Sequence, residues 1–221
     1  MIFEMYKDRL STFITDIDNT IADTSARLKR SLKEIGREEV YEKTSGQFGG
    51  FSDYLNAEEL ERFWGIFLSG RFLYLDEPVP AAAKFLTRLV EDGVDLVYLT
   101  GRHDDTGDTM RPGTVDWLEK HGFPPPGRNG TELYMKPERS KDDLEFKLDC
   151  LGELVQASLG SDGLVGVGDH PDDAVAYRSS GVKPFLLTWP DLFSENELDN
   201  SAEGVEVVEN WTALEEKLFV N

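Results

Sequence analysis

Short apolar segments alternate with amphipathic segments along most of this 221-residue chain, and this alternation constrains the fold more than any other feature. Each apolar segment stops at polar residues, as buried strands do. Buried strands that alternate with helices are typical of a parallel sheet with helices on both faces. We therefore predict an α/β fold with strands at 10–15, 94–99, 132–136, 164–167, 184–189 and 205–208. The accompanying helices are expected at 81–91, 115–121, 142–159 and 174–179.

Residues 21–77 interrupt the alternation, because they contain helical patterns but no clear strand. A helix is expected between about 23 and 45, broken at Gly36, and a second helix should begin after Asn56, a good N-cap residue. The second helix carries aromatic side chains whose spacing favours core packing: Phe63, Trp64 and Phe67. We expect a core domain of residues 1–20 and 78–221, with a helical insertion at 21–77.

The balance of charges limits the partners of the protein. Asp and Glu number 43 against 23 Lys and Arg, which gives a net charge of −20. This field repels nucleic-acid backbones and anionic membrane surfaces, so a phosphate ester could bind only beside a local cation. The single cysteine, Cys150, excludes an intrachain disulfide. With no signal-peptide pattern and no apolar run near ~20 residues, we expect a soluble cytoplasmic protein.

Polar residues follow three of the predicted strands at the point where each strand ends. Asp16 and Asp18 follow the first strand, Thr100 ends the second, and Asp169 follows the fourth, with Asp172 and Asp173 just beyond. Taken alone, Asp16 to Thr20 could be an ordinary acidic turn. Ligands of an open parallel sheet bind beyond the carboxyl ends of its strands, however, and clustered carboxylates suit a hard cation such as Mg²⁺. Three such ends together indicate a magnesium site.

The same residues resemble the motifs of the haloacid dehalogenase superfamily. Asp16-Ile17-Asp18-Asn19-Thr20 is similar to its first motif, and Leu96-Val97-Tyr98-Leu99-Thr100 to its second. Gly168-Asp169-His170-Pro171-Asp172-Asp173 is similar to its fourth. The resemblance implies a three-layer Rossmann-like sheet domain. It also implies that residues 21–77 form a small helical cap of type C1, which closes over the site.

The resemblance assigns roles to the strand-end residues. Asp16 would be the nucleophile that forms an aspartyl-phosphate, and Asp18 the general acid and base. Thr100 would bind the phosphoryl group. Asp169 would hold Mg²⁺ together with Asp16 and the backbone carbonyl of Asp18, and Asp173 would support that shell of ligands.

The third motif of the superfamily is a lysine, for which the sequence offers three positions. Lys136 ends a predicted strand, Lys141 precedes a predicted helix, and Lys147 lies near the start of that helix. Phe146-Lys147 followed by an apolar helix resembles the family pattern best. Lys147 is therefore our preferred residue, with Lys141 and Lys136 as alternatives.

Gly101 and Arg102 follow Thr100 and are candidate phosphate-binding residues. A Thr-Gly-Arg sequence resembles the polynucleotide 3′-phosphatase branch of the superfamily, in which the Arg contacts phosphate; an ordinary surface arginine is the alternative. We therefore predict a Mg²⁺-dependent phosphomonoesterase that acts on a small phosphorylated metabolite. The alternatives are a nucleotide or nucleic-acid 3′-end phosphatase, which the net charge disfavours, and a non-catalytic Mg²⁺-binding interaction protein.

Overall fold

The predicted parallel sheet is confirmed by a computed structural model, which describes residues 10–44, 46, 48–104, 109–158, 160–188 and 204–219. Six parallel strands lie in the order β5-β4-β1-β6-β7-β8, with β1 at the centre between β4 and β6. Their bounds are Thr12–Thr15 (β1), Asp95–His103 (β4), Thr131–Lys136 (β5), Leu164–Gly168 (β6), Lys183–Leu187 (β7) and Glu206–Val208 (β8).

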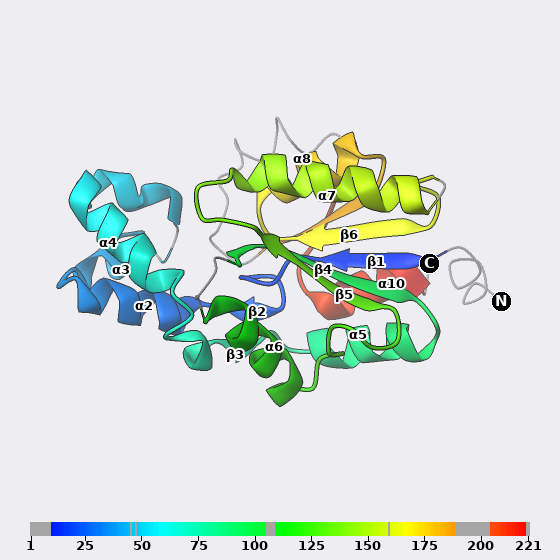
Figure 1. Ribbon diagram of the computed structural model, residues 1–221, viewed down its shortest axis with the longest axis horizontal. Helices are drawn as coiled ribbons and strands as arrows, with labels where there is room; N and C mark the ends of the chain where they lie inside the picture. Colours follow the sequence, from blue (N-terminus) through cyan, green and yellow to red (C-terminus); the bar gives the residue numbers. More distant parts are fainter. Residues whose placement is uncertain are drawn as a thin grey trace.

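Helices cover both faces of this sheet (Figure 1). One face carries α5 (Ala82–Glu91), α6 (Met110–Lys120) and α10 (Trp211–Phe219), and the other carries α7 (Asp143–Ala157) and α8 (Pro171–Ser179). Successive side chains of a strand point to opposite faces, so neighbouring β1 residues enter different cores. Phe13 packs against Phe85 and Trp211 at ring-centroid distances of 5.4 and 6.2 Å, whereas Ile14 belongs to the core with Tyr177.

Between β1 and α5 the chain forms a group of helices with its own apolar core, which we call the insertion. It contains α2 (Ser25–Glu34), α3 (Glu39–Thr44), the 3₁₀ turn η1 (Phe48–Asp53), α4 (Ala57–Phe67) and η2 (Leu73–Leu75). Helices α2, α3 and α4 lie on the left of Figure 1, beyond the carboxyl ends of the sheet strands. Asn56 begins α4 as predicted, because its side chain accepts from the backbone of Glu59 while Glu59 accepts from the backbone of Asn56.

Two features of the structure differ from the prediction, one at the base of the insertion and one in the helix after β4. A two-residue strand, β2 (Ala22–Asp23), pairs antiparallel with β3 (Glu77–Pro78) where the chain enters and leaves the insertion. These strands are too short to produce an alternating pattern in the sequence. Helix α6 begins five residues before the expected start at 115, because Pro112 lies in its first turn, where the missing amide hydrogen costs nothing.

Strand β4 is also longer than the predicted 94–99 and continues through a bulge to His103. The expected last residues of two other elements, Leu159 and Trp189, lie outside the described residues. Among the helices that the structure describes, none has the length and apolar composition needed to cross a membrane.

Candidate active site

A cavity of about 340 Å³ lies at the carboxyl ends of the central strands. It brings together seven of the eight predicted site residues: Asp16, Asp18, Thr100, Gly101, Lys147, Asp169 and Asp173. Asp16 and Asp18 follow β1, Thr100 and Gly101 belong to the last part of β4, and Asp169 follows β6. These residues, distant in sequence, therefore line one cavity. Arg102, the eighth residue, is buried behind this cavity.

Lys147 lies at the centre of a buried cluster of charges. Its Nζ donates to Oδ1 of Asp16 at 3.0 Å and also to Oδ1 of Asp173. All three side chains are at most 8% exposed. Oxygen atoms of Asp16, Asp169 and Asp173 lie within 4.8 Å of one another, a spacing that allows one cation to contact all three.

The two alternative lysines make other contacts. Lys136 pairs with Asp143 and donates to the backbone carbonyl of Lys141 at 3.1 Å. Lys141 pairs with Asp149 at 2.7 Å, on the exposed side of α7. Among the three candidates, Lys147 is the residue that the fold places against Asp16.

Local backbone structure explains the position of Asp173. His170 is the N-cap of α8, and its backbone amide donates to Oδ2 of Asp173 at 3.2 Å, as in a capping box. The carboxylate lies directly over Gly168, where an added Cβ would overlap the atoms of Asp173. A glycine at the end of β6 is therefore required for this approach. Asp169, the next residue, accepts a hydrogen bond from Oγ1 of Thr20 at 3.1 Å.

The cluster carries more negative than positive charge. Burial raises the pKa of Asp16 to about 7, and the charges of Asp173 and Asp18 add to this rise while Lys147 opposes it. Burial, Asp16 and Asp173 raise the pKa of Asp169 well above its usual range. When all three carboxylates are ionised, the one ammonium group leaves two negative charges uncompensated. A divalent cation is the ligand that these donor atoms and this charge fit best.

Asp18 is held by two arginines. Its Oδ1 accepts from Nη2 of Arg102 at 2.6 Å and from Nη2 of Arg27 at 2.5 Å. Burial alone would raise the pKa of Asp18, but the guanidinium groups of Arg102 and Arg27 hold it well below its usual range. Arg102 also contacts Asp76 at 3.1 Å, and its side chain is fully buried. A phosphate contact by Arg102 therefore stays a prediction, since in this arrangement two carboxylates occupy its guanidinium.

Sequence reasoning missed Arg27 and Asp76. Arg27 lies on the inner side of α2 beside Leu28, but an arginine next to an apolar stripe is usually exposed. Asp76 lies in a segment that reads as a polar boundary before Pro78. Neither residue carries a local pattern that could have marked it.

The insertion forms the opposite wall of the cavity, with Trp64, Phe67 and Leu68 of α4 and its C-terminal end. Phe67 is buried and stacks 5.7 Å from Phe63, which agrees with the predicted core packing. Trp64 is only partly buried and lines the cavity as well as packing against Phe63. The carboxylate cluster thus faces an apolar, aromatic surface.

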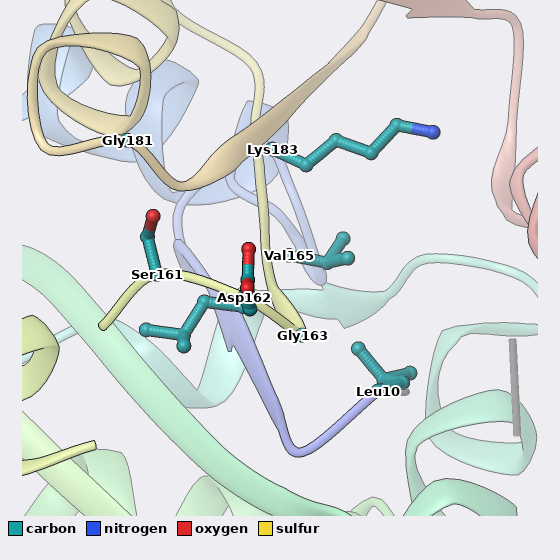
Figure 2. Close-up of a pocket in the computed structure, with 8 residues that line it drawn as sticks. Leu10, Ser161, Asp162, Gly163, Val165, Gly181 and Lys183 are labelled. Atoms are coloured by element: carbon teal, nitrogen blue, oxygen red, sulfur yellow. The ribbon is translucent and has the colours of Figure 1, made fainter. Parts of the chain in front are cut away.

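A larger cavity, of about 710 Å³, opens at the other edge of the sheet, at the amino ends of β6 and β7 (Figure 2). Gly163, which precedes β6, and Val165 of β6 line it together with Lys183, the first residue of β7. Its one lysine, Lys183, pairs with Glu206 at 2.8 Å, and its one carboxylate, Asp162, is exposed. We therefore place the candidate active site in the smaller cavity, which holds the clustered charges.

No family model and no curated protein sequence matches this chain. Solved structures match it over nearly its whole length. A candidate phosphatase from Clostridium difficile superposes with a TM-score of 0.68 at 14% identity, covering 95% of this chain and 98% of the other. A haloacid dehalogenase-like hydrolase from Streptococcus pneumoniae gives 0.62 at 16% identity, covering 93% and 97%. A phosphoserine phosphatase, solved as an analogue of its phospho-aspartyl intermediate, gives 0.57 at 14% identity, covering 95% and 98%.

These identities are low, so the similarity is one of fold. The fold agrees with the sequence motifs, because the residues that carry the resemblance lie where the β1, β4 and β6 strands end. The chain has the fold of the haloacid dehalogenase-like hydrolases.

Proposed function

We propose that this protein is a Mg²⁺-dependent phosphomonoesterase that hydrolyses a small phosphorylated metabolite through an aspartyl-phosphate on Asp16. The observation that carries the proposal is the contact of Lys147 with both Asp16 and Asp173, beside Asp169. Burying charged groups in this way costs free energy of folding. Buried carboxylates with shifted pKa values are therefore found mostly at functional sites. The phospho-aspartyl analogue of the phosphoserine phosphatase, which has a similar fold, adds support.

Charge balance supports a divalent cation in the site. Asp16, Asp169 and the backbone carbonyl of Asp18 would hold it, with Asp173 beside them. When bound, Mg²⁺ would offset the carboxylates and polarise the phosphoryl group. The Lys147 ammonium would keep its contact with Asp16, hold that carboxylate in place and stabilise negative charge that develops on the phosphoryl oxygens.

The proposed hydrolysis uses two carboxylates that follow β1, those of Asp16 and Asp18. Asp16 attacks phosphorus and the ester P–O bond breaks. Asp18 supplies the proton that the leaving alcohol needs, and it must first take up that proton from solvent, because Arg102 and Arg27 favour its ionised form. Asp18 then takes a proton from water, which attacks the phosphorus of the aspartyl-phosphate. Inorganic phosphate leaves, and the Asp16 carboxylate is regenerated. Thr100, a buried residue of β4 that lines the cavity, would bind a phosphoryl oxygen.

The test is a panel of phosphorylated metabolites, assayed for release of inorganic phosphate with and without Mg²⁺. We expect activity on at least one small ester and none on matched compounds that lack the phosphate. The panel should include a 3′-phosphorylated oligonucleotide, since the alternative function predicts that it outperforms mononucleotides. That alternative rests largely on Arg102, whose guanidinium contacts Asp18 and Asp76 here. Failure of every ester with Mg²⁺-loaded, folded protein would refute the proposal.

Removal of the cation is expected to abolish activity and to lower stability. Chelation with EDTA should stop phosphate release, and added Mg²⁺ should restore it. Mg²⁺ at about 100 times its Kd should add ~2.7 kcal/mol to the free energy of unfolding, measured by thermal or denaturant unfolding. The Asp169→Asn variant is the control: its stability should no longer respond to Mg²⁺. An equal response in this variant would place the cation elsewhere.

We further propose that the insertion, residues 21–77, is a cap that contacts the leaving group through Trp64. Trp64→Ala should raise KM about 5- to 10-fold for esters with an apolar leaving group and change kcat less, because it removes contact area rather than a reacting group. Tyr74→Ala is a matched control, since Tyr74 is an aromatic residue of the same insertion that is 64% exposed. Equal effects of the two variants would argue against the cap contact.

A further inference from the structure

Four charged side chains form one buried network behind the cavity: Asp18, Arg27, Asp76 and Arg102. The side chains of Arg27, Arg102 and Asp76 are 0% exposed, and that of Asp18 is 22% exposed. Each arginine contacts both carboxylates. Arg27 reaches Asp18 at 2.5 Å and Asp76 at 3.0 Å, and Arg102 reaches them at 2.6 and 3.1 Å. The two positive and two negative charges cancel.

The network joins parts of the chain that are distant in sequence. Asp18 follows β1 and Arg102 belongs to β4, so both come from strand ends of the sheet domain. Arg27 lies on α2, the first helix of the insertion, and Asp76 immediately precedes β3, where the insertion ends. The network therefore connects the carboxylate beside the cavity to both ends of the insertion.

Side chains of α6 and α4 make further contacts with the network. Nη1 of Arg102 donates to Oγ1 of Thr114 at 3.0 Å, and Nε1 of Trp117 donates to the backbone carbonyl of Asp76 at 2.9 Å. The guanidinium of Arg27 lies 4.1 Å above the ring of Phe67, which itself lines the cavity. These contacts leave the arginines little freedom to turn. Asp18 is the only member of the network that lines the cavity.

A network built for stability alone would not need its one exposed carboxylate to face the site. Burying ion pairs is often no more stabilising than apolar packing, so such networks are weak evidence of a stability role. Here Arg27 and Arg102 both donate to Oδ1 of Asp18, and Arg102 also donates to Oδ2. These contacts restrict the orientation of a group whose geometry matters for proton transfer.

We propose that Arg27, Arg102 and Asp76 are positioning residues that orient the Asp18 carboxylate toward the leaving group and link its orientation to the insertion. The inference rests on the proposed function, because it concerns the proton transfer assigned to Asp18. The three residues act through Asp18, and none of them is among the residues that line the cavity.

The test compares two kinds of ester in the Mg²⁺-loaded protein. An alkyl phosphate needs a proton on its leaving oxygen, whereas the leaving group of p-nitrophenyl phosphate departs without one. Arg27→Lys keeps the positive charge, but a lysine has no guanidinium group that could contact Asp18 and Asp76 through separate nitrogen atoms. We expect kcat/KM for the best alkyl monophosphate of the panel to fall at least ~10-fold and kcat/KM for p-nitrophenyl phosphate to fall less than ~3-fold, because general acid catalysis contributes about 10²–10⁴-fold. The comparison uses kcat/KM because this parameter reports formation of the aspartyl-phosphate, whereas kcat also includes its hydrolysis, a step that both esters share.

A mutant cycle with Asp18→Asn separates positioning from a general loss of structure. In that background, Arg27→Lys should cause no further loss, since the group that it positions is already absent. If Arg27→Lys does not fold, the double variant Arg27→Met/Asp76→Asn removes one charge of each sign and serves in its place. Equal losses of kcat/KM on both esters, or losses that add to that of Asp18→Asn, would overturn the proposal. An inactive wild-type protein would instead refute the proposed function itself.

Discussion

Asp16→Asn is expected to lower kcat for phosphate release by at least about 10⁴-fold, the scale of loss seen when a nucleophile is removed. The amide has nearly the same shape, but it cannot form the aspartyl-phosphate. Folding should not suffer, because the substitution removes one of three buried carboxylates that repel one another. The measurement is steady-state phosphate release on the best ester of the panel, together with the thermal midpoint of the metal-free protein.

Asp172→Asn is the matched control for this change. Asp172 lies at the same edge of the sheet, but its side chain is 53% exposed and contacts His170. The same chemical substitution there should leave kcat within about 2-fold, since exposed carboxylates of this kind contribute little. If Asp16→Asn kept measurable turnover that Asp172→Asn lost, the nucleophile would have to be assigned to another carboxylate.

Lys147→Met is expected to have the largest effect on stability. It leaves Asp16 and Asp173 buried without their shared cation, and breaking a buried pair in this way costs about 3–5 kcal/mol. Mg²⁺ should recover part of this loss, because it supplies positive charge to the same carboxylates. Activity with saturating Mg²⁺ should still fall about 10²–10³-fold, as when a charge-stabilising donor is removed from a site. Denaturant unfolding with and without Mg²⁺ and phosphate release are the measurements.

Lys141→Met tests whether this effect is specific to the buried lysine. Lys141 belongs to the same segment and also pairs with an aspartate, but its partner Asp149 is 61% exposed. A surface pair of this kind is worth no more than about 1 kcal/mol. A loss of activity in Lys141→Met with normal activity in Lys147→Met would mean that the wrong lysine had been chosen.

The strand-end residues could be predicted because a parallel sheet imposes their meeting. Asp16, Thr100 and Asp169 are up to 153 residues apart in sequence. Each lies at or near the carboxyl end of a buried strand, and the carboxyl ends of such strands share one edge. The strands could be predicted from apolar runs because strands of a parallel sheet are buried on both faces. Lys147 was harder to assign, since helix periodicity indicates which face a lysine occupies but not which carboxylate it reaches.

Arg27 and Asp76 could not be predicted for a different reason. Each acquires its role only through the path of the insertion, which returns the chain to its starting point at the β2–β3 pair. No local pattern encodes such a return, because β2 and β3 have two residues each. The early start of α6 could not be predicted for a similar reason. Pro112 and Gly113 have low helix propensity, and the first turn is stabilised by tertiary packing, which the local sequence does not show.

The β2–β3 pair also has a consequence for how a chain of this kind can diversify. Paired strands lie about 5 Å apart, so the insertion leaves the sheet domain and rejoins it at nearly one point. The cost of closing a loop grows only slowly with its length. Segments of other lengths and surfaces could therefore be exchanged at this junction without shifting the register of β1 against β4. An exchange that retained Asp18 and Arg102 would still need to bring in its own counterparts of Arg27 and Asp76.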